Sequence, residues 1–207
     1  MGALRGSLTF SRFYVIGELS DDFQKVVEKR IQKHAIVPLV PEEDEVQHHG
    51  WACHTDPFDT ELDYDKIFLG EYVALALRVD RWAIPGPLLK AHLKEAEQKL
   101  LEQKGLERLG RKTKAELKDM VVKKLRKRLV PVTKSYDLIW NRTTGVVLFF
   151  SHSEKIHELA QEMFEKTFGV QLLLESPGTL ADKSVLSRAE QQAFADLEPT
   201  LLGGTGT

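Results

Sequence analysis

The chain has 207 residues, of which 42% are hydrophobic and 29% are charged. This apolar fraction excludes a disordered protein and is enough for one well-packed domain, or for a core with a small appendage. No run approaches the roughly 18 apolar residues of a membrane-spanning helix, and the first residues lack the apolar core of a signal peptide. A single cysteine, Cys53, excludes an intramolecular disulfide and favours a cytosolic protein.

Charge is unevenly distributed along the chain, although the formal net charge is only −2. Residues 41–80 contain eleven acidic side chains and two basic ones, a net charge of −9. Residues 104–134 contain twelve basic side chains and three acidic ones, a net charge of +9. A binding partner responds to these local fields rather than to the sum, so the two segments are candidate binding regions.

The predicted elements begin with a strand over residues 8–17, which are β-branched and aromatic. A helix over residues 20–34 follows, with Ser20 as its N-cap, Asp21 and Asp22 in its first turn, and an apolar stripe. The stripe consists of Phe23, Val26, Val27 and Ile31. A polar, acidic stretch is then expected to run to about Asp65.

Residues 66–80 give the clearest strand pattern, because their apolar side chains alternate with a period of two. One face would carry Ile67, Leu69, Val73, Leu75, Leu77 and Val79. Pro87 suits the first turn of a helix over residues 87–104, and Gly105 suits its C-terminal cap. The apolar residues of this helix recur at helical spacing: Leu89, Leu93, Ala96 and Leu100.

A second long helix is predicted over residues 112–129, where Thr113 and Glu116 form a capping box and Pro131 stops the helix. A hairpin follows, with its turn around residues 142–145. Ser151 and Glu154 form another capping box, for a helix over residues 153–168 that Gly169 ends. Its apolar face consists of Ile156, Leu159, Ala160, Met163, Phe164 and Phe168. Residues 170–176 predict a last strand.

The element order β-α-β-α-α-β-β-α-β predicts an α+β fold, with an antiparallel sheet, a long basic helix and packed amphipathic helices. Residues 1–178 would form this domain. Residues 179–207 would form a short C-terminal tail, with one helix within residues 186–197 and a disordered Gly203–Thr207 end.

The basic helix is the strongest functional signal. Its apolar stripe of Leu117, Val121 and Leu125 is expected to face the sheet, which would turn its cations toward solvent. Closely spaced cations repel one another unless a polyanion compensates them, and DNA phosphates would do so. The alternative is a solvated face, or one paired with the acidic segment 41–80. The candidate nucleic-acid-binding residues are Arg111, Lys112, Lys114, Lys118, Lys123, Lys124, Arg126, Lys127, Arg128 and Lys134.

Other clusters suggest weaker candidates. His48, His49, Cys53 and His54 include the residue types that bind zinc, but their spacing fits no standard zinc pattern and favours a polar loop. The acidic run 42–45 consists of consecutive residues that point in different directions, whereas a divalent-cation nuclease needs converging carboxylates. We therefore expect no metal, no cofactor and no catalysis.

Four further single residues have an ordinary structural interpretation. Cys53 is expected to be a buried thiol, and the three tryptophans, at 51, 82 and 140, are expected to lie in the core. His152 and His157 are expected at the surface.

The order of elements and several short stretches resemble the RdgC family over roughly residues 7–178. The stretches that carry the resemblance are Leu8–Gly17, Gly50-Trp51, Ile84–Leu93, Lys112–Leu129, Thr143–Ser153 and Gly169–Leu174. The resemblance implies a bacterial protein that forms a ring-shaped dimer around duplex DNA, without sequence preference, and restrains strand exchange by RecA.

Two departures from the family pattern affect these expectations. Where the family commonly has the sequence LLPRAF, residues 125–130 are more basic and lack the aromatic residue, and family members continue well beyond this length. The sequence therefore predicts a homodimer that binds double-stranded DNA in the cytoplasm, in association with the nucleoid. The alternative is a non-catalytic protein-interaction or scaffold module that holds a protein partner through its acidic segment 41–80.

Overall fold

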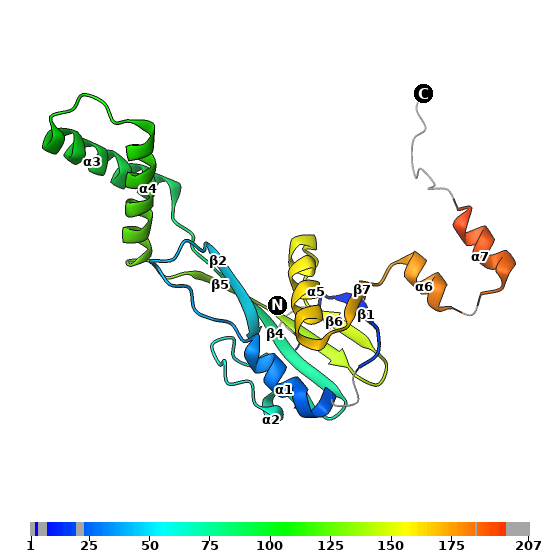
Figure 1. Ribbon diagram of the computed structural model, residues 1–207. Coiled ribbons are helices and arrows are strands. Elements are labelled where there is room, and N and C mark those ends of the chain that lie inside the picture. Colours follow the sequence, from blue (N-terminus) through cyan, green and yellow to red (C-terminus); the bar gives the residue numbers. More distant parts are fainter. Residues whose placement is uncertain (1–2, 4–7, 20–22, 185, 198–207) are drawn as a thin grey trace, which may run out of the picture.

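A computed structural model describes residue 3 and residues 8–19, 23–184 and 186–197. Within these residues the chain forms one antiparallel sheet with helices on one of its faces, a helical arm on one side and a helical tail on the other (Figure 1). The expected α+β class is therefore confirmed. No helix among these residues is both long enough and apolar enough to cross a membrane.

The sheet has the strand order β2-β4-β5-β6-β1-β7, and β3 pairs with β4 beside this path. Every ladder is antiparallel. The strands are β1 (Ser11–Ile16), β2 (Gln47–Ala52), β3 (Phe68–Leu69), β4 (Tyr72–Arg81), β5 (Val132–Asn141), β6 (Val146–Phe149) and β7 (Gln171–Leu174).

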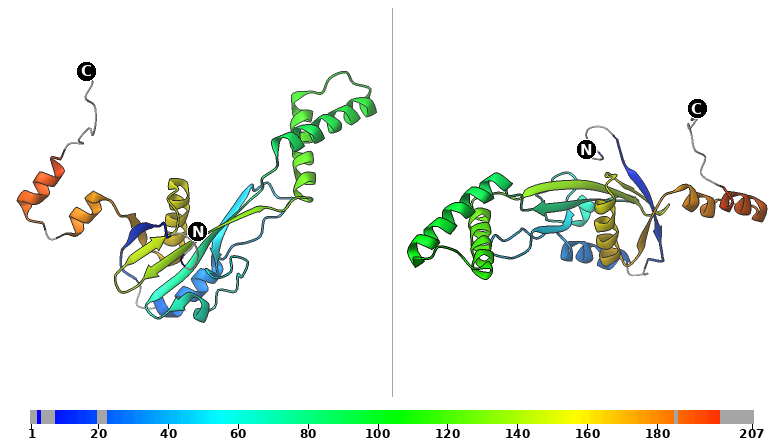
Figure 2. Two further views of the ribbon diagram at one scale, coloured as in Figure 1. Left: turned by 180° about the vertical axis from the view of Figure 1, so that it is seen from behind. Right: turned by 90° about the horizontal axis from the view of Figure 1, so that it is seen from above.

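Two helices pack side by side on one face of the sheet, and two others form the arm (Figures 1 and 2). The helices are α1 (Phe23–Lys33), α2 (Tyr64–Ile67), α3 (Gly86–Lys104), α4 (Arg111–Arg126), α5 (Glu154–Phe168), α6 (Pro177–Lys183) and α7 (Arg188–Ala195). The pair on the sheet is α1 and α5.

The core lies between the sheet and these two helices. Trp140 of β5 is 1% exposed, and its ring packs against Phe23 of α1 and against Phe164 and Phe168 of α5, with ring centroids 5.1 to 5.6 Å apart. Trp51 of β2 is fully buried and donates a 2.8 Å hydrogen bond from Nε1 to Thr167 Oγ1. The predicted apolar faces of α1 and α5 therefore meet the sheet as expected, and the three tryptophans are buried.

The stretch before β4 differs from its prediction. Residues 47–52 were expected within a polar loop, but they form β2, which pairs with β4 along its length. Gly50 allows the close approach of Ile36, because a Cβ at this position would lie 2.6 Å from the Ile36 backbone. The predicted strand over residues 66–80 is also divided: residues 64–67 form α2, and a turn at Gly70 (φ +63°) separates β3 from β4.

Helix ends are only partly as predicted. Gly105 and Gly169 adopt the left-handed conformation and end α3 and α5, as expected. The predicted capping boxes at Thr113 and Ser151 are wrong, because α4 has Gly110 as its N-cap and α5 has Ser153, without side-chain capping in either case. Similar local patterns can start a helix one turn apart, and the tertiary contacts decide between them.

The tail contains α6, which the sequence did not predict, and α7, which falls within the predicted range 186–197. Both helices begin with a capping box, formed by Ser176 with Thr179 and by Ser187 with Glu190. The expected cap at Ser20, with the acidic first turn after it, and the expected disorder of residues 203–207 lie outside the described residues.

Candidate nucleic-acid interface

The basic helix α4 lies on the arm and packs against α3 instead of against the sheet (Figures 1 and 2). Leu117, Val121 and Leu125 are buried, as the helical spacing predicted, but their partner is the antiparallel neighbour α3. The expectation that this stripe covers the sheet is therefore wrong. Because the arm projects from the sheet, more of the α4 surface is exposed to solvent than that expectation allowed.

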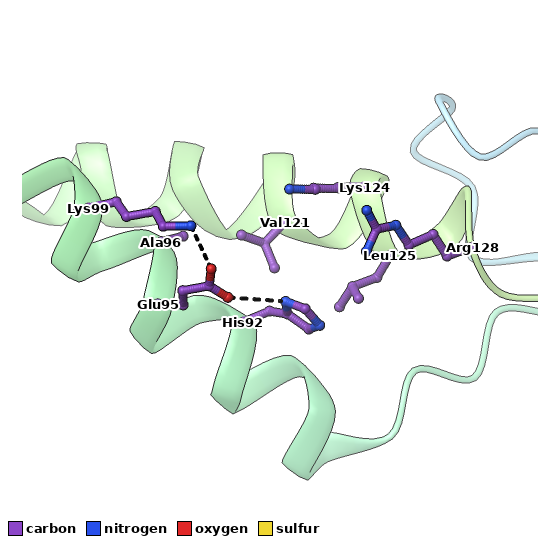
Figure 3. A pocket seen from close by; sticks show the side chains of 8 residues that line it. All are labelled: His92, Glu95, Ala96, Lys99, Val121, Lys124, Leu125 and Arg128. Carbon is purple, nitrogen blue, oxygen red and sulfur yellow. Dashed lines mark hydrogen bonds and ion pairs between the residues drawn. The ribbon is translucent and has the colours of Figure 1, made fainter.

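A small pocket lies along the seam between α3 and α4 (Figure 3). Val121 and Leu125 form its apolar part, while Lys124 and Arg128 lie at its edge. On the α3 side, Lys99 donates a 2.6 Å hydrogen bond to Glu95. This lysine, its hydrogen bond first, lowers the pKa of the Glu95 carboxyl group, so that carboxylate stays ionised beside the basic helix.

The sheet end of α4 is anchored to the acidic loop that precedes β2. Lys123 Nζ lies 3.0 Å from an Asp44 oxygen, and Lys127 Nζ lies 2.8 Å from a Glu42 oxygen. The hydrogen bond from the lysine is in each case the main cause that lowers the pKa of the carboxyl group. Two of the ten candidate cations therefore have partners within the chain, as the alternative interpretation of the basic helix proposed.

Arg126 occupies a different position from the one expected. It was predicted to point outward, but it is only 6% exposed, and its Nη1 donates a 2.5 Å hydrogen bond to the backbone oxygen of Glu43. Its guanidinium also lies over the Trp82 ring, 5.9 Å from the centroid. Sequence reasoning missed this anchor, because no local pattern connects these three positions.

The remaining candidates divide into one paired lysine and six unpaired cations. Lys114 lies 3.7 Å from Glu97 of α3. The other six are exposed, and none forms an ion pair with a described residue. These six are Arg111, Lys112, Lys118, Lys124, Arg128 and Lys134. Five lie on α4 or directly after it, and Lys134 lies on β5 close to the base of the arm.

The histidine and cysteine cluster does not converge on one point. His48 Nδ1 hydrogen-bonds to the Val37 backbone oxygen at 3.0 Å, while the Cys53 thiol, 3% exposed as expected, hydrogen-bonds to Thr55 Oγ1 at 3.1 Å. Burial lowers the pKa of both His49 and His54. No group of three or more His, Cys, Asp or Glu side chains in the described part of the chain is placed to hold a metal ion.

Acidic side chains near the arm are engaged by cations of the chain itself. Besides Glu42 and Asp44, the buried Asp80 carboxylate accepts a bidentate pair of hydrogen bonds from Arg78, at 2.6 and 2.9 Å, and a third from Thr133 at 2.7 Å. These contacts satisfy the carboxylate within the protein.

His157 is also placed differently from its prediction. It was expected at the surface, but it is only 8% exposed, and its Nε2 lies 2.7 Å from the Ser151 backbone oxygen. Its ring packs edge-to-face against Phe13, with centroids 5.2 Å apart. His152, by contrast, is exposed as expected.

The fold and the site together define an α+β protein with a projecting, basic helical arm. A family model described as "Putative exonuclease, RdgC" matches residues 12–186. The chain therefore belongs to the RdgC family, as the resemblance over residues 7–178 predicted. A search of curated proteins finds no match.

Proposed function

We propose that the chain binds double-stranded DNA without sequence preference, through the arm, and modulates recombination in the manner of its family. The observation that carries the proposal is the row of six exposed cations, without ion-pair partners among the described residues, on α4 and at the base of the arm. Family membership supports an association with DNA.

The geometry of the arm favours contacts to phosphates over contacts to bases. The cations stand on the solvent side of a two-helix hairpin, so they can approach a polyanion without being desolvated first. Each phosphate that they neutralise releases counterions and adds about 0.9 to the slope of log K against log salt. Such contacts fix the position of the protein on the duplex but carry no sequence information.

The test is a fluorescence-anisotropy titration of two unrelated duplexes at several salt concentrations. Reversal of three cations that have no role in the fold, Arg111→Glu, Lys112→Glu and Lys118→Glu, should weaken binding to both duplexes equally. It should also lower the salt slope by roughly two to three, because about three phosphate contacts are lost. Arg126 is unsuitable here because it is buried.

The matched control places the same charge change on the body of the protein. Lys29→Glu, Arg30→Glu and Lys33→Glu alter three exposed residues of α1 and should leave the affinity and the slope close to wild type. Wild type that fails to bind either duplex at low salt, or an arm variant that binds as well as wild type, would refute the proposal.

We further propose that the chain binds DNA without cleaving it. The acidic residues nearest to the arm support this, since Glu42, Asp44 and Asp80 already bind cations of the chain. Purified protein incubated with end-labelled duplex and magnesium or manganese should leave the DNA intact. Degradation that Glu43→Ala abolishes, or stoichiometric zinc that His49→Ala removes, would contradict the proposal.

We place this activity in the bacterial cytoplasm, at the nucleoid, and propose that the protein acts as a homodimer. The rival function is a scaffold that holds a protein partner through residues 41–80. The ion pairs of Glu42 and Asp44 with α4 count against it, because two of its acidic groups are occupied. A pull-down that requires residues 42–45 and is insensitive to added DNA would favour the rival.

A further inference from the structure

A groove of about 920 Å³ lies between the first turns of α5 and the arm-proximal ends of β2, β4 and β5. Its floor is apolar and consists of Val79 and Tyr136 from the sheet with Ile156 and Leu159 from α5. The last three pack against the core but remain only partly buried. The floor is therefore a continuation of the hydrophobic core that nothing in the chain covers completely.

The rim of the groove is basic. Arg81, Lys134 and Lys155 line it from three separate elements, and no acidic side chain is among the residues that line it. Arg81 and Lys155 are exposed, and neither makes an ion pair with a described residue. An apolar floor inside a cationic rim fits a segment that presents large apolar side chains flanked by acidic ones.

Helix α7 has this complementary character. It buries none of its residues and extends from the sheet on the side away from the arm (Figures 1 and 2). At helical spacing, Ala193, Phe194 and Leu197 share one side of the helix, with Glu190 and Asp196 beside them. Phe194 is 37% exposed and Leu197 is 70% exposed. The capping box at Ser187 keeps this short segment helical without a partner.

We propose that α7 of one copy docks in the groove of a second copy of the chain, and that this contact forms the homodimer. Phe194 and Leu197 cover the apolar floor, while Asp196 and Glu190 face the cationic rim. Because each copy has one groove and one α7, a two-fold axis allows both helices to dock at once, which doubles the buried surface in a closed assembly.

This interface is distinct from the proposed DNA contact. The DNA-binding proposal rests on α4 and the base of the arm, whereas the dimer rests on α7, α5 and the sheet. Only Lys134 lines the groove and is also a candidate DNA contact. The experiment therefore avoids Lys134, so failure of the dimer and failure of DNA binding are measured separately.

The test exchanges charges between two variants of the full chain and measures mass by light scattering at micromolar concentration. The groove variant carries Arg81→Glu and Lys155→Glu. The helix variant carries Glu190→Gln, Gln192→Arg and Asp196→Arg, an opposite change of equal size that keeps the capping pattern. Since all five side chains are exposed, both variants should unfold at the wild-type temperature.

Wild type should be a dimer, and each variant alone should be a monomer, because like charges then meet at both contacts. An equimolar mixture should dimerise again, since each groove now faces a helix of opposite charge. Phe194→Asp should also give a monomer, whereas Gln191→Asp, on the opposite side of α7, should not.

Three outcomes would overturn the proposal. These are a wild-type monomer, a groove variant that dimerises as well as wild type, and a mixture that stays monomeric. Docking of α7 within its own chain predicts the first and third outcomes, so it is separated from docking between copies. DNA titrations of the same variants show whether duplex binding persists without the dimer.

Discussion

The body of the protein and its arm are stabilised in different ways. In the body, large side chains such as Trp51, Trp140 and Phe164 are less than 2% exposed, between the sheet and two helices. In the arm, α3 buries no residue, and α4 buries four along a single seam. Elements with few buried contacts open at low free-energy cost, and binding elements are often of this kind.

The two regions also use their charges differently. Where α4 meets the body, its cations are held by Glu42, Asp44 and the Glu43 backbone. Along the rest of α4, exposed cations such as Arg111 and Lys118 have no ion-pair partner in the described part of the chain. The inner end of the helix thus serves as an anchor, while the outer cations remain available for binding.

The largest expected effect contrasts one core residue from each region. Trp140→Ala should lower the free energy of unfolding by about 3–5 kcal/mol, because it leaves a large cavity among packed aromatic rings. Leu125→Ala should cost about 2 kcal/mol, near the lower end for such truncations, because the two-helix arm can close around the gap. Urea denaturation measures both changes.

Hydrogen exchange serves as the control for this contrast. Backbone amides of α3 and α4 should exchange faster than those of β4 and β5 in wild type, and Leu125→Ala should accelerate only the arm. Equal protection of the arm and the sheet would contradict the difference between the regions.

A smaller effect is expected at the junction between the regions. Arg126→Ala should cost about 1.5–3 kcal/mol, because it removes a charged hydrogen bond to Glu43 and the contact over Trp82. Its exchange signature should be faster exchange of the backbone around residues 43–46. Lys123→Ala, one turn earlier but exposed, is the matched control and should change stability little. If both variants were equally stable, Arg126 would not be the anchor.

The smallest expected effect concerns pH. The lysine partners lower the pKa values of Glu42 and Asp44 in the folded protein, so these carboxylates contribute stability above their ordinary pKa values of 4.5 and 3.8. That contribution is lost as the pH falls from those values through the lowered ones. Glu42→Gln with Asp44→Asn should therefore lower the melting temperature slightly at pH 7 but not near pH 2, and molar salt should reduce the difference. A difference that persists at low pH would contradict this origin.

Sequence patterns predicted most of the elements, because periodicity reports burial within one helix or strand. The stripes of α1, α4 and α5 were identified from their spacing, and Gly105 and Gly169 were identified as helix ends. β2 was missed, since its central His48, His49 and Gly50 lack the alternating apolar pattern of a strand. Pairing with β4 and the close contact of Gly50 with Ile36 form this strand, and both contacts are distant in sequence.

The same limit applies to the candidate sites. The sequence by itself determined the α+β class, the family resemblance, and the presence of a basic amphipathic helix opposite an acidic segment, because these follow from composition and local spacing. Only the tertiary structure decided that this helix packs on α3, that Arg126 is buried, and that Lys123 and Lys127 bind the acidic loop. The physical reason is that an apolar stripe specifies burial but not the partner that provides it. Which cations remain free for DNA therefore depends on contacts between residues up to 83 positions apart.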